Sequence, residues 1–222
     1  MFDSEFIKNA YTEIKNNIPK GVSLLAVSKY QTLEKIEYLH TIGQKDFGEN
    51  YLQELEQKAT ALPNLNWHFI GSIQSRKIKN IVKYASTIQS IEKLEQLIKI
   101  DSQASKLNKT IEALLQINID NDPNKSGFKP SDINEIIDCI ERSNNMKNLN
   151  LTGLMCLPAK ADNCGQSFHR MKDLFDTINN RLNTNLKLTK LSMGMSADYK
   201  EAIQNGSTMV RIGSSLFGER SN

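Results

Sequence analysis

The chain has 222 residues, of which 39% are hydrophobic and 24% are charged, a composition typical of an ordinary globular domain. Its net charge of +3 is spread along the chain rather than gathered in a basic block, so no nucleic-acid-binding surface is expected. No apolar run approaches the roughly 20 residues of a membrane-spanning helix. The first residues carry acids and lack the apolar segment of a secretory signal, so no membrane partner is expected.

Three cysteines, Cys139, Cys156 and Cys164, form neither a CxxC pair nor a Cys/His cluster with metal-ligand spacing. A low, odd count argues against a disulfide scaffold and favours a reducing compartment. We therefore expect no metal site and a cytoplasmic location.

The first element in chain order is a helix over Ser4–Asn17, because its apolar residues recur at helical spacing and a Pro-Lys-Gly sequence follows. A short, almost wholly apolar run at 23–29 then predicts a strand that is buried on both faces. Strands and helices alternate from there. Further strands are predicted at 46–50, 66–71, 86–91, 111–118, 149–157, 190–195 and 208–213. The intervening helices are predicted at 33–42, 51–61, 75–84, 93–106, 131–143, 166–182 and 197–205.

Eight strands that alternate with helices imply a parallel sheet, because parallel neighbours need crossover connections. Eight such units in a chain of this length close most economically into a barrel. The expected fold is therefore α/β, a single (β/α)8 TIM-like barrel over residues 1–222 with an extra N-terminal helix. A doubly wound open sheet is the alternative, although no G-x-G-x-x-G follows the first strand.

Functional side chains of such barrels lie at the C-terminal ends of the strands, and Lys29 is the last residue of an otherwise apolar predicted strand. In a partly desolvated barrel mouth its amine would be shifted towards neutrality, and a neutral amine is the nucleophile that forms a Schiff base. The alternative is a lysine whose aliphatic stem packs while its ammonium reaches water.

Small polar residues at the ends of the last two strands indicate a phosphate site. Gly213 and Ser214 offer backbone N–H groups and a hydroxyl after the last strand, and Ser192 and Ser196 follow the strand before it. Arg211 adds a cation at the same place, or else it pairs with a carboxylate inside the barrel.

Two further residues have alternative interpretations. Asn50 is placed to contact a hydroxyl of a bound ring, or to cap the following helix. His68 lies between Trp67 and Phe69 in a strand, and a structural role is favoured over a catalytic one.

Together these segments resemble the pyridoxal phosphate homeostasis proteins. The matching stretches run from about residue 22 to 220: LLAVSK, FGENY, NWHFIGSIQ, LLQIN, KSGF, TGLM, LSMGMSADYKEAI and GSTMVRIGSSLFGER. The resemblance implies a fold-type III barrel that binds pyridoxal 5′-phosphate (PLP), like the N-terminal domain of alanine racemase. Two departures are QSRK in place of the usual QSNK, and Ser214 where many members have threonine.

The resemblance also implies the site. Lys29 would carry PLP as a Schiff base, Arg211 would lie near the pyridine nitrogen and Asn50 beside the ring. The phosphate would contact Ser192, Ser196, Gly213 and Ser214.

The implied function is PLP (vitamin B6) homeostasis by a carrier without catalytic residues, which influences amino-acid and keto-acid pools and has PLP-dependent apo-enzymes as partners. An arginine beside the pyridine nitrogen weakens the ring as an electron sink, which fits either a racemase-like site or a carrier that holds PLP without driving chemistry. The chain ends soon after the last strand, so we expect no second domain with an acid/base partner, and a monomer. The alternatives are an amino-acid racemase of narrow activity and a barrel that binds another phosphorylated metabolite noncovalently.

Overall fold

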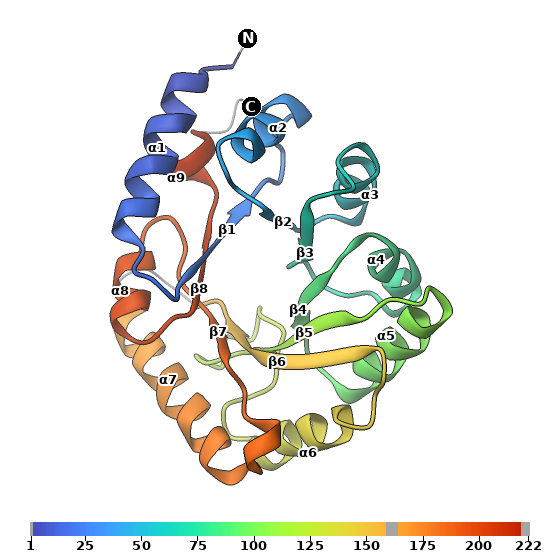
Figure 1. Ribbon diagram of the computed structural model, residues 1–222. Helices are drawn as coiled ribbons and strands as arrows, with labels where there is room; N and C mark the ends of the chain where they lie inside the picture. The colour runs from blue at the N-terminus through green and yellow to red at the C-terminus, as the bar shows by residue number, and fades with distance from the viewer. Residues whose placement is uncertain (1, 159–163, 219–222) are drawn as a thin grey trace.

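Eight parallel strands close into a barrel in the computed structural model, which describes residues 2–158 and 164–218 (Figure 1). Each strand pairs with its neighbours in sequence, and β8 pairs with β1. The predicted barrel is thus confirmed, and the doubly wound open sheet is wrong. The strands are β1 Ser23–Val27, β2 Asp46–Glu49, β3 Asn66–Phe69, β4 Thr87–Ile91, β5 Ile111–Ile117, β6 Leu149–Cys156, β7 Lys190–Ser192 and β8 Met209–Ile212.

The ends of the predicted domain, residues 1 and 219–222, lie outside the described residues, as does the segment 159–163. The last two letters of the final matching motif, Glu219 and Arg220, fall there.

Helices surround the barrel in the predicted order. They are α1 Ser4–Asn17, α2 Leu33–Thr41, α3 Leu52–Ala61, η1 Ser75–Lys77, α4 Ile78–Tyr84, α5 Leu94–Lys106, α6 Ile133–Ser143, α7 Cys164–Arg181, η3 Thr184–Leu186, α8 Tyr199–Gln204 and α9 Ser214–Phe217. The short elements η3 and α9 were not predicted, because a single turn is too short to show helical periodicity.

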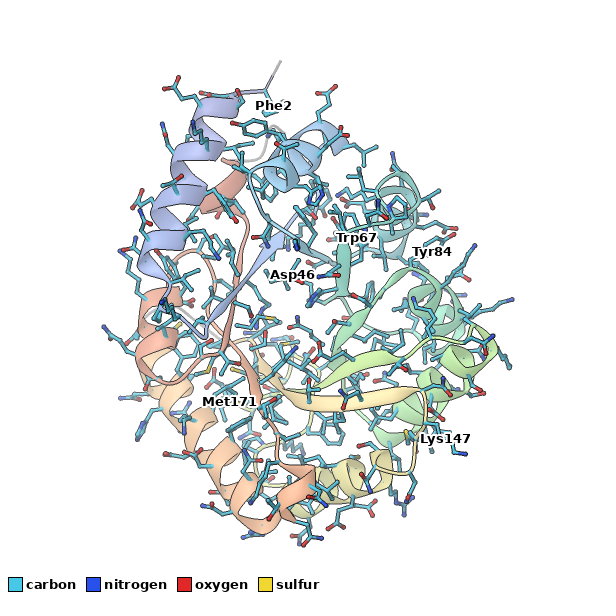
Figure 2. The ribbon with its side chains drawn as sticks, in the orientation of Figure 1. Phe2, Asp46, Trp67, Tyr84, Lys147 and Met171 are labelled. Atoms are coloured by element: carbon cyan, nitrogen blue, oxygen red, sulfur yellow. The ribbon has the colours of Figure 1, made fainter. Side chains whose placement is uncertain are left out.

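The core lies between the strands and the helices. Met171 of α7 and Trp67 of β3 are both buried (Figure 2). The Trp67 indole N–H donates to the Leu62 carbonyl oxygen, 3.0 Å away, at the end of α3. Both faces of the strands are therefore covered, which explains why their sequences are nearly continuous apolar runs.

The extra N-terminal helix α1 packs against α9, which follows the last strand (Figure 1). Asp3 caps α1 by accepting a hydrogen bond from the Phe6 N–H at 2.9 Å. Ile7 and Ile14 are the buried residues of this helix. The two ends of the described chain thus meet beside the barrel mouth.

Candidate functional site

A cavity of about 380 Å³ lies at the C-terminal ends of the strands and collects six of the seven predicted site residues. Its walls are largely apolar, with a few polar groups that converge, as in sites for small molecules. The lining residues are Val27, Lys29, Asn50, Ile70, Met155, Leu157, Met195, Ser196, Ala197, Arg211, Gly213 and Ser214.

Lys29 lies in a turn two residues beyond the end of β1, and its side chain is half-buried. Among the described residues that line the cavity, only Lys29 and Arg211 carry ionisable groups. Both are cations, so the electrostatics of the cavity favour an anionic ligand.

Arg211 is 3% exposed and is held at two points by the barrel. Its Nη1 donates to Ser192 Oγ at 2.8 Å, and its Nη2 donates to the Cys156 carbonyl oxygen at 2.8 Å. Burial lowers the pKa of Arg211, although a guanidinium stays protonated at neutral pH. Within residues 2–158 and 164–218 no carboxylate lies at ion-pair distance from it, so the predicted alternative of a barrel ion pair is wrong.

Ser192 is the one predicted residue that does not line the cavity. It is fully buried, and its hydroxyl accepts from Arg211 and donates to Gln89 Oε1 at 2.7 Å. A contact between Ser192 and phosphate therefore gains no support from this geometry. Its position instead makes it a support for the Arg211 guanidinium.

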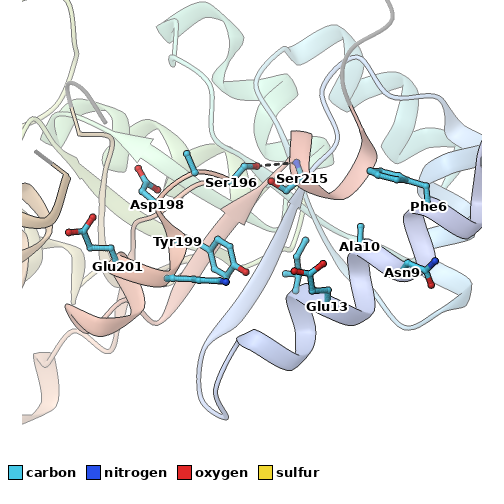
Figure 3. Close-up of a pocket in the computed structure, with 12 residues that line it drawn as sticks. Phe6, Asn9, Ala10, Glu13, Ser196, Asp198, Tyr199, Glu201 and Ser215 are labelled. Atoms are coloured by element: carbon cyan, nitrogen blue, oxygen red, sulfur yellow. Dashed lines mark hydrogen bonds between the residues drawn. The ribbon is translucent and has the colours of Figure 1, made fainter. Parts of the chain in front are cut away.

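The turn after β8 provides hydrogen-bond donors at the other side of the cavity. The Gly213 and Ser215 N–H groups donate to Ser196 Oγ at 3.4 and 3.3 Å, the second of these drawn in Figure 3. Ser214 is exposed between them. Backbone N–H groups and hydroxyls gathered at one turn are the kind of groups that bind a phosphate.

Asn50 presents a buried amide oxygen, Oδ1, that has no hydrogen-bond partner within the described residues. Buried polar atoms are rarely left unpaired, so this oxygen indicates a donor from a ligand. Tyr51 holds the N-cap position of α3, so the predicted capping role of Asn50 is wrong. Gly71 permits the close approach of the Asn50 backbone, since a Cβ at residue 71 would lie 1.8 Å from the Asn50 carbonyl oxygen.

A buried ion-pair cluster behind the Lys29 turn was not predicted. Lys58, 4% exposed, donates through Nζ to the Ser28 carbonyl oxygen at 2.7 Å, to Glu49 Oε1 at 2.8 Å and to Glu54 Oε2 at 2.6 Å. Glu54 Oε2 also accepts the Tyr30 N–H at 2.7 Å, and Tyr30 has a left-handed φ of 63°. The Lys58 cluster therefore holds the backbone on both sides of Lys29. The i,i+4 spacing of Glu54 and Lys58 was a signal for a pair, but not for its burial.

A second cavity, of about 650 Å³, lies between α1 and residues 196–201 (Figure 3). Glu13, Asp198 and Glu201 line it, with Lys200 as the cation. Its carboxylates would repel a phosphate, so the smaller cavity is the candidate site.

None of the helices in residues 2–158 and 164–218 has the length and apolar character needed to cross a bilayer. That part of the chain also contains no group of three or more His, Cys, Asp or Glu placed to hold a metal ion.

Comparison with known proteins shows the family to which the chain is related. The alanine racemase N-terminal domain family matches residues 2–221. The pyridoxal phosphate homeostasis protein of Synechocystis sp. is 39% identical over 97% of this chain and 99% of its own length. The chain belongs to the family of pyridoxal phosphate homeostasis proteins. A second member, from Pasteurella multocida, is 38% identical over 90% of this chain and 87% of its own. The resemblance seen in the motifs is thereby confirmed.

Solved structures agree with this family. PipY of Synechococcus elongatus without PLP superposes with a TM-score of 0.87 at 31% identity, covering 96% of this chain and 100% of PipY. PipY with PLP bound gives a TM-score of 0.84 at 27% identity, again over 96% of this chain and all of PipY. An alanine racemase from Clostridium difficile gives 0.81 at 17% identity, over 98% of this chain and 58% of the racemase, which shows the shared fold alone.

Proposed function

We propose that this protein binds PLP covalently through Lys29 and serves as a carrier that maintains the supply of the cofactor. The observation that carries the proposal is the cavity at the barrel mouth, where a lysine, an arginine and a turn rich in donors converge. Further support comes from the relatives, which are named pyridoxal phosphate homeostasis proteins, and from PipY, a similar structure with PLP bound.

The residues of the cavity fit the chemical groups of PLP. Lys29 offers the amine that forms a Schiff base with the aldehyde. Asn50 Oδ1, which has no partner among the described residues, can accept a hydrogen bond from the ring hydroxyl. The phosphate would lie against Ser196, Gly213 and Ser214, while Arg211 would face the pyridine nitrogen. When bound, PLP supplies an aldehyde that reacts reversibly with amines and a ring that can withdraw electrons.

Two features support a carrier over a racemase, whereas Arg211 is compatible with either function. Arg211 can only donate hydrogen bonds, so it disfavours a protonated pyridine nitrogen and weakens electron withdrawal by the ring. Racemisation needs acid/base groups on both faces of the substrate carbon, yet among the described lining residues only Lys29 offers a side chain of the kind that acts as a general acid or base. The nearby tyrosines are used elsewhere. Tyr30 and Tyr51 pair with each other at the exposed surface through their hydroxyls, 2.7 Å apart, and Tyr199 lines the other cavity.

Delivery to PLP-dependent apo-enzymes, with its effect on amino-acid and keto-acid pools, belongs to the same proposal, as do the monomeric state and a cytoplasmic location. The three cysteines are buried as thiols, which supports a reducing compartment. Co-purification with an apo-enzyme, followed by recovery of its activity, tests delivery.

The covalent bond is tested by loading the protein with PLP, recording its absorbance, reducing it with borohydride and mapping the modified peptide. We expect a yellow protein that is modified at Lys29 and a Lys29→Ala variant that remains colourless. Lys99→Ala, at an exposed position of α5, is the matched control and should stay yellow. Modification at another lysine would contradict the proposal. A colourless wild type would also contradict it and would favour noncovalent binding of another phosphorylated metabolite.

Single-enantiomer amino acids in deuterium oxide separate the carrier from the racemase. A carrier should leave the Cα hydrogen and the optical rotation unchanged over hours. Rapid exchange with loss of optical activity would establish the racemase alternative.

A further inference from the structure

Four buried side chains form a chain of contacts through the interior of the barrel. They connect the candidate site with the other end of the barrel. Arg211 of β8 donates to Ser192 of β7 at 2.8 Å, and Ser192 donates to Gln89 Oε1 of β4 at 2.7 Å. Gln89 Nε2 lies 3.0 Å from His68 Nδ1 of β3. All four are at most 3% exposed. We call Arg211, Ser192, Gln89 and His68 the axial relay.

The chemistry of its members sets the direction of every hydrogen bond in the relay. A guanidinium has no acceptor, so the Ser192 oxygen accepts from Arg211 and its single hydrogen is left for Gln89. Gln89 must therefore present its oxygen to Ser192 and its amide nitrogen to His68. This orientation is also favoured by Met209, whose Sδ lies 3.2 Å from Gln89 Nε2 and can only accept.

Because the Gln89 amide nitrogen can only donate, His68 Nδ1 must accept this hydrogen bond. The imidazole proton is then on Nε2, which lies 3.5 Å from Asp46 Oδ1. Asp46 Oδ1 also accepts a hydrogen bond from Asn66 Nδ2 at 3.0 Å, so it acts as an acceptor. An ionised Asp46 suits a donor at Nε2. The geometry at both ring nitrogens thus points to the same tautomer.

We propose that the axial relay locks His68 in its neutral Nε2–H tautomer, and that Gln89 and His68 are in turn positioning residues for Arg211. A proton on Nδ1 would face the Gln89 N–H groups and force the amide to rotate. The rotated amide would offer N–H groups to Ser192 and its oxygen to the Met209 sulfur, so the hydroxyl would have no acceptor in the relay. The Arg211 guanidinium would then lose its fixed orientation at the cavity wall.

The tautomer can be measured in the protein without cofactor, so this part stands apart from the proposed function. Long-range ¹H–¹⁵N correlation spectra of protein labelled at histidine distinguish the two neutral forms. His40 serves as an internal control, because its Nδ1 lies 3.0 Å from the Gln44 carbonyl oxygen, which only accepts, and must carry the proton. We expect His68 as Nε2–H and His40 as Nδ1–H. An Nδ1–H form of His68 in the wild type would overturn the relay.

Variants test whether Arg211 sets the tautomer of a histidine that it does not touch. Arg211→Met should free the Ser192 hydroxyl, let Gln89 adopt both orientations and give His68 both tautomers. Gln89→Glu should move a proton onto His68 Nδ1, because a carboxylate only accepts. Ser192→Thr keeps the hydroxyl and should keep the Nε2–H form, whereas Ser192→Ala should lose it. A pure Nε2–H form in both Arg211→Met and Ser192→Ala would overturn the relay, and the wild-type spectrum decides the tautomer even if a variant fails to fold.

The positioning role rests on the proposed function and is read out by titration with PLP. Gln89→Met keeps the volume but removes the amide, and the loss of one buried hydrogen bond should raise the Kd for PLP about tenfold. Gln96→Met, a buried glutamine of α5 outside the relay, is the control and should leave the Kd unchanged. Unchanged affinity in Gln89→Met would refute positioning. A wild type that binds no PLP would instead refute the proposed function and leave the tautomer result intact.

Discussion

At the scale of single residues, the setting of Lys29 depends on a lysine that is buried behind it. The Lys58 ammonium accounts for one oxygen of the fully buried Glu49 carboxylate, and Ser28 Oγ donates to the same oxygen at 2.6 Å. Burial raises the pKa of Glu49, while Lys58 and Ser28 act against this rise. Losing one partner of the Lys58–Glu49 ion pair should therefore lower the free energy of unfolding more than losing both.

Lys58→Met should reduce the free energy of unfolding by about 3 kcal/mol, because it leaves the Glu49 carboxylate buried without its cation. Adding Glu49→Gln should restore part of this loss, since no uncompensated charge then remains. Urea unfolding of the two single variants and the double variant measures the coupling.

Lys172→Met is the matched control, because its ion pair with Asp176 is solvent-exposed and should contribute about 0.5 kcal/mol or less. Additive effects of the Lys58 and Glu49 substitutions would show that the two residues are not energetically coupled.

The Lys58→Met variant should also react with PLP more slowly at Lys29, because the turn that carries Lys29 loses its support at the Ser28 carbonyl.

At the scale of secondary-structure elements, α4 ends against a lysine from a different part of the chain. Lys109 precedes β5, and its Nζ donates to the carbonyl oxygens of Val82 and Ala85 at 2.8 Å each, and to that of Lys83 at 3.2 Å. A helix leaves its last carbonyls unpaired and carries partial negative charge at that end, so a cation there is stabilising. Burial lowers the pKa of the Lys109 ammonium.

Lys109→Met should therefore lower the free energy of unfolding by about 1–2 kcal/mol, because three carbonyl groups at the end of α4 lose their donor while the aliphatic stem is retained. Thermal or urea unfolding checks the magnitude. Lys99→Met, in the middle of the exposed face of α5, should change stability by less than about 0.5 kcal/mol. Equal effects of the two substitutions would rule out a capping role for Lys109.

At the scale of the whole molecule, the three thiols report on the opening of the barrel. All three are buried, and burial raises the pKa of Cys139 and of Cys156 to about 12 and that of Cys164 to about 11. Only the thiolate reacts readily, so the folded protein should be nearly inert to thiol reagents at neutral pH. All three cysteines should react together once denaturant unfolds the chain. Rapid labelling of the native protein would show local opening around the labelled residue.

The same shifts give stability a direction with pH. The folded state keeps the thiol protons above pH 9.0, the ordinary thiol value, whereas the unfolded state releases them. The folded state then binds more protons, so the free energy of unfolding should fall as pH rises from about 9 towards 12. A Cys139→Ala, Cys156→Ala variant should show a shallower fall in its urea midpoint over this range. Identical slopes would contradict the assignment to these thiols.

The alternation of strands and helices, the helix at the N-terminus and the position of Lys29 after the first strand were all readable from the sequence alone. These features depend on local signals, namely the period of apolar residues and the glycine and proline residues that end each element. Six of the seven predicted site residues line the cavity because the C-terminal ends of all strands meet at one end of a closed barrel.

Only the tertiary structure decided how the remaining polar side chains are used. Ser192 does not line the cavity and instead forms hydrogen bonds with Arg211 and Gln89. Asn50 does not cap α3, and its side-chain oxygen has no hydrogen-bond partner among the described residues. Lys58 becomes a buried support of the Lys29 turn. Each outcome depends on which donor from one strand or helix meets which acceptor from another. Closure of the barrel sets those meetings between residues that lie far apart in the chain, and no local pattern records them.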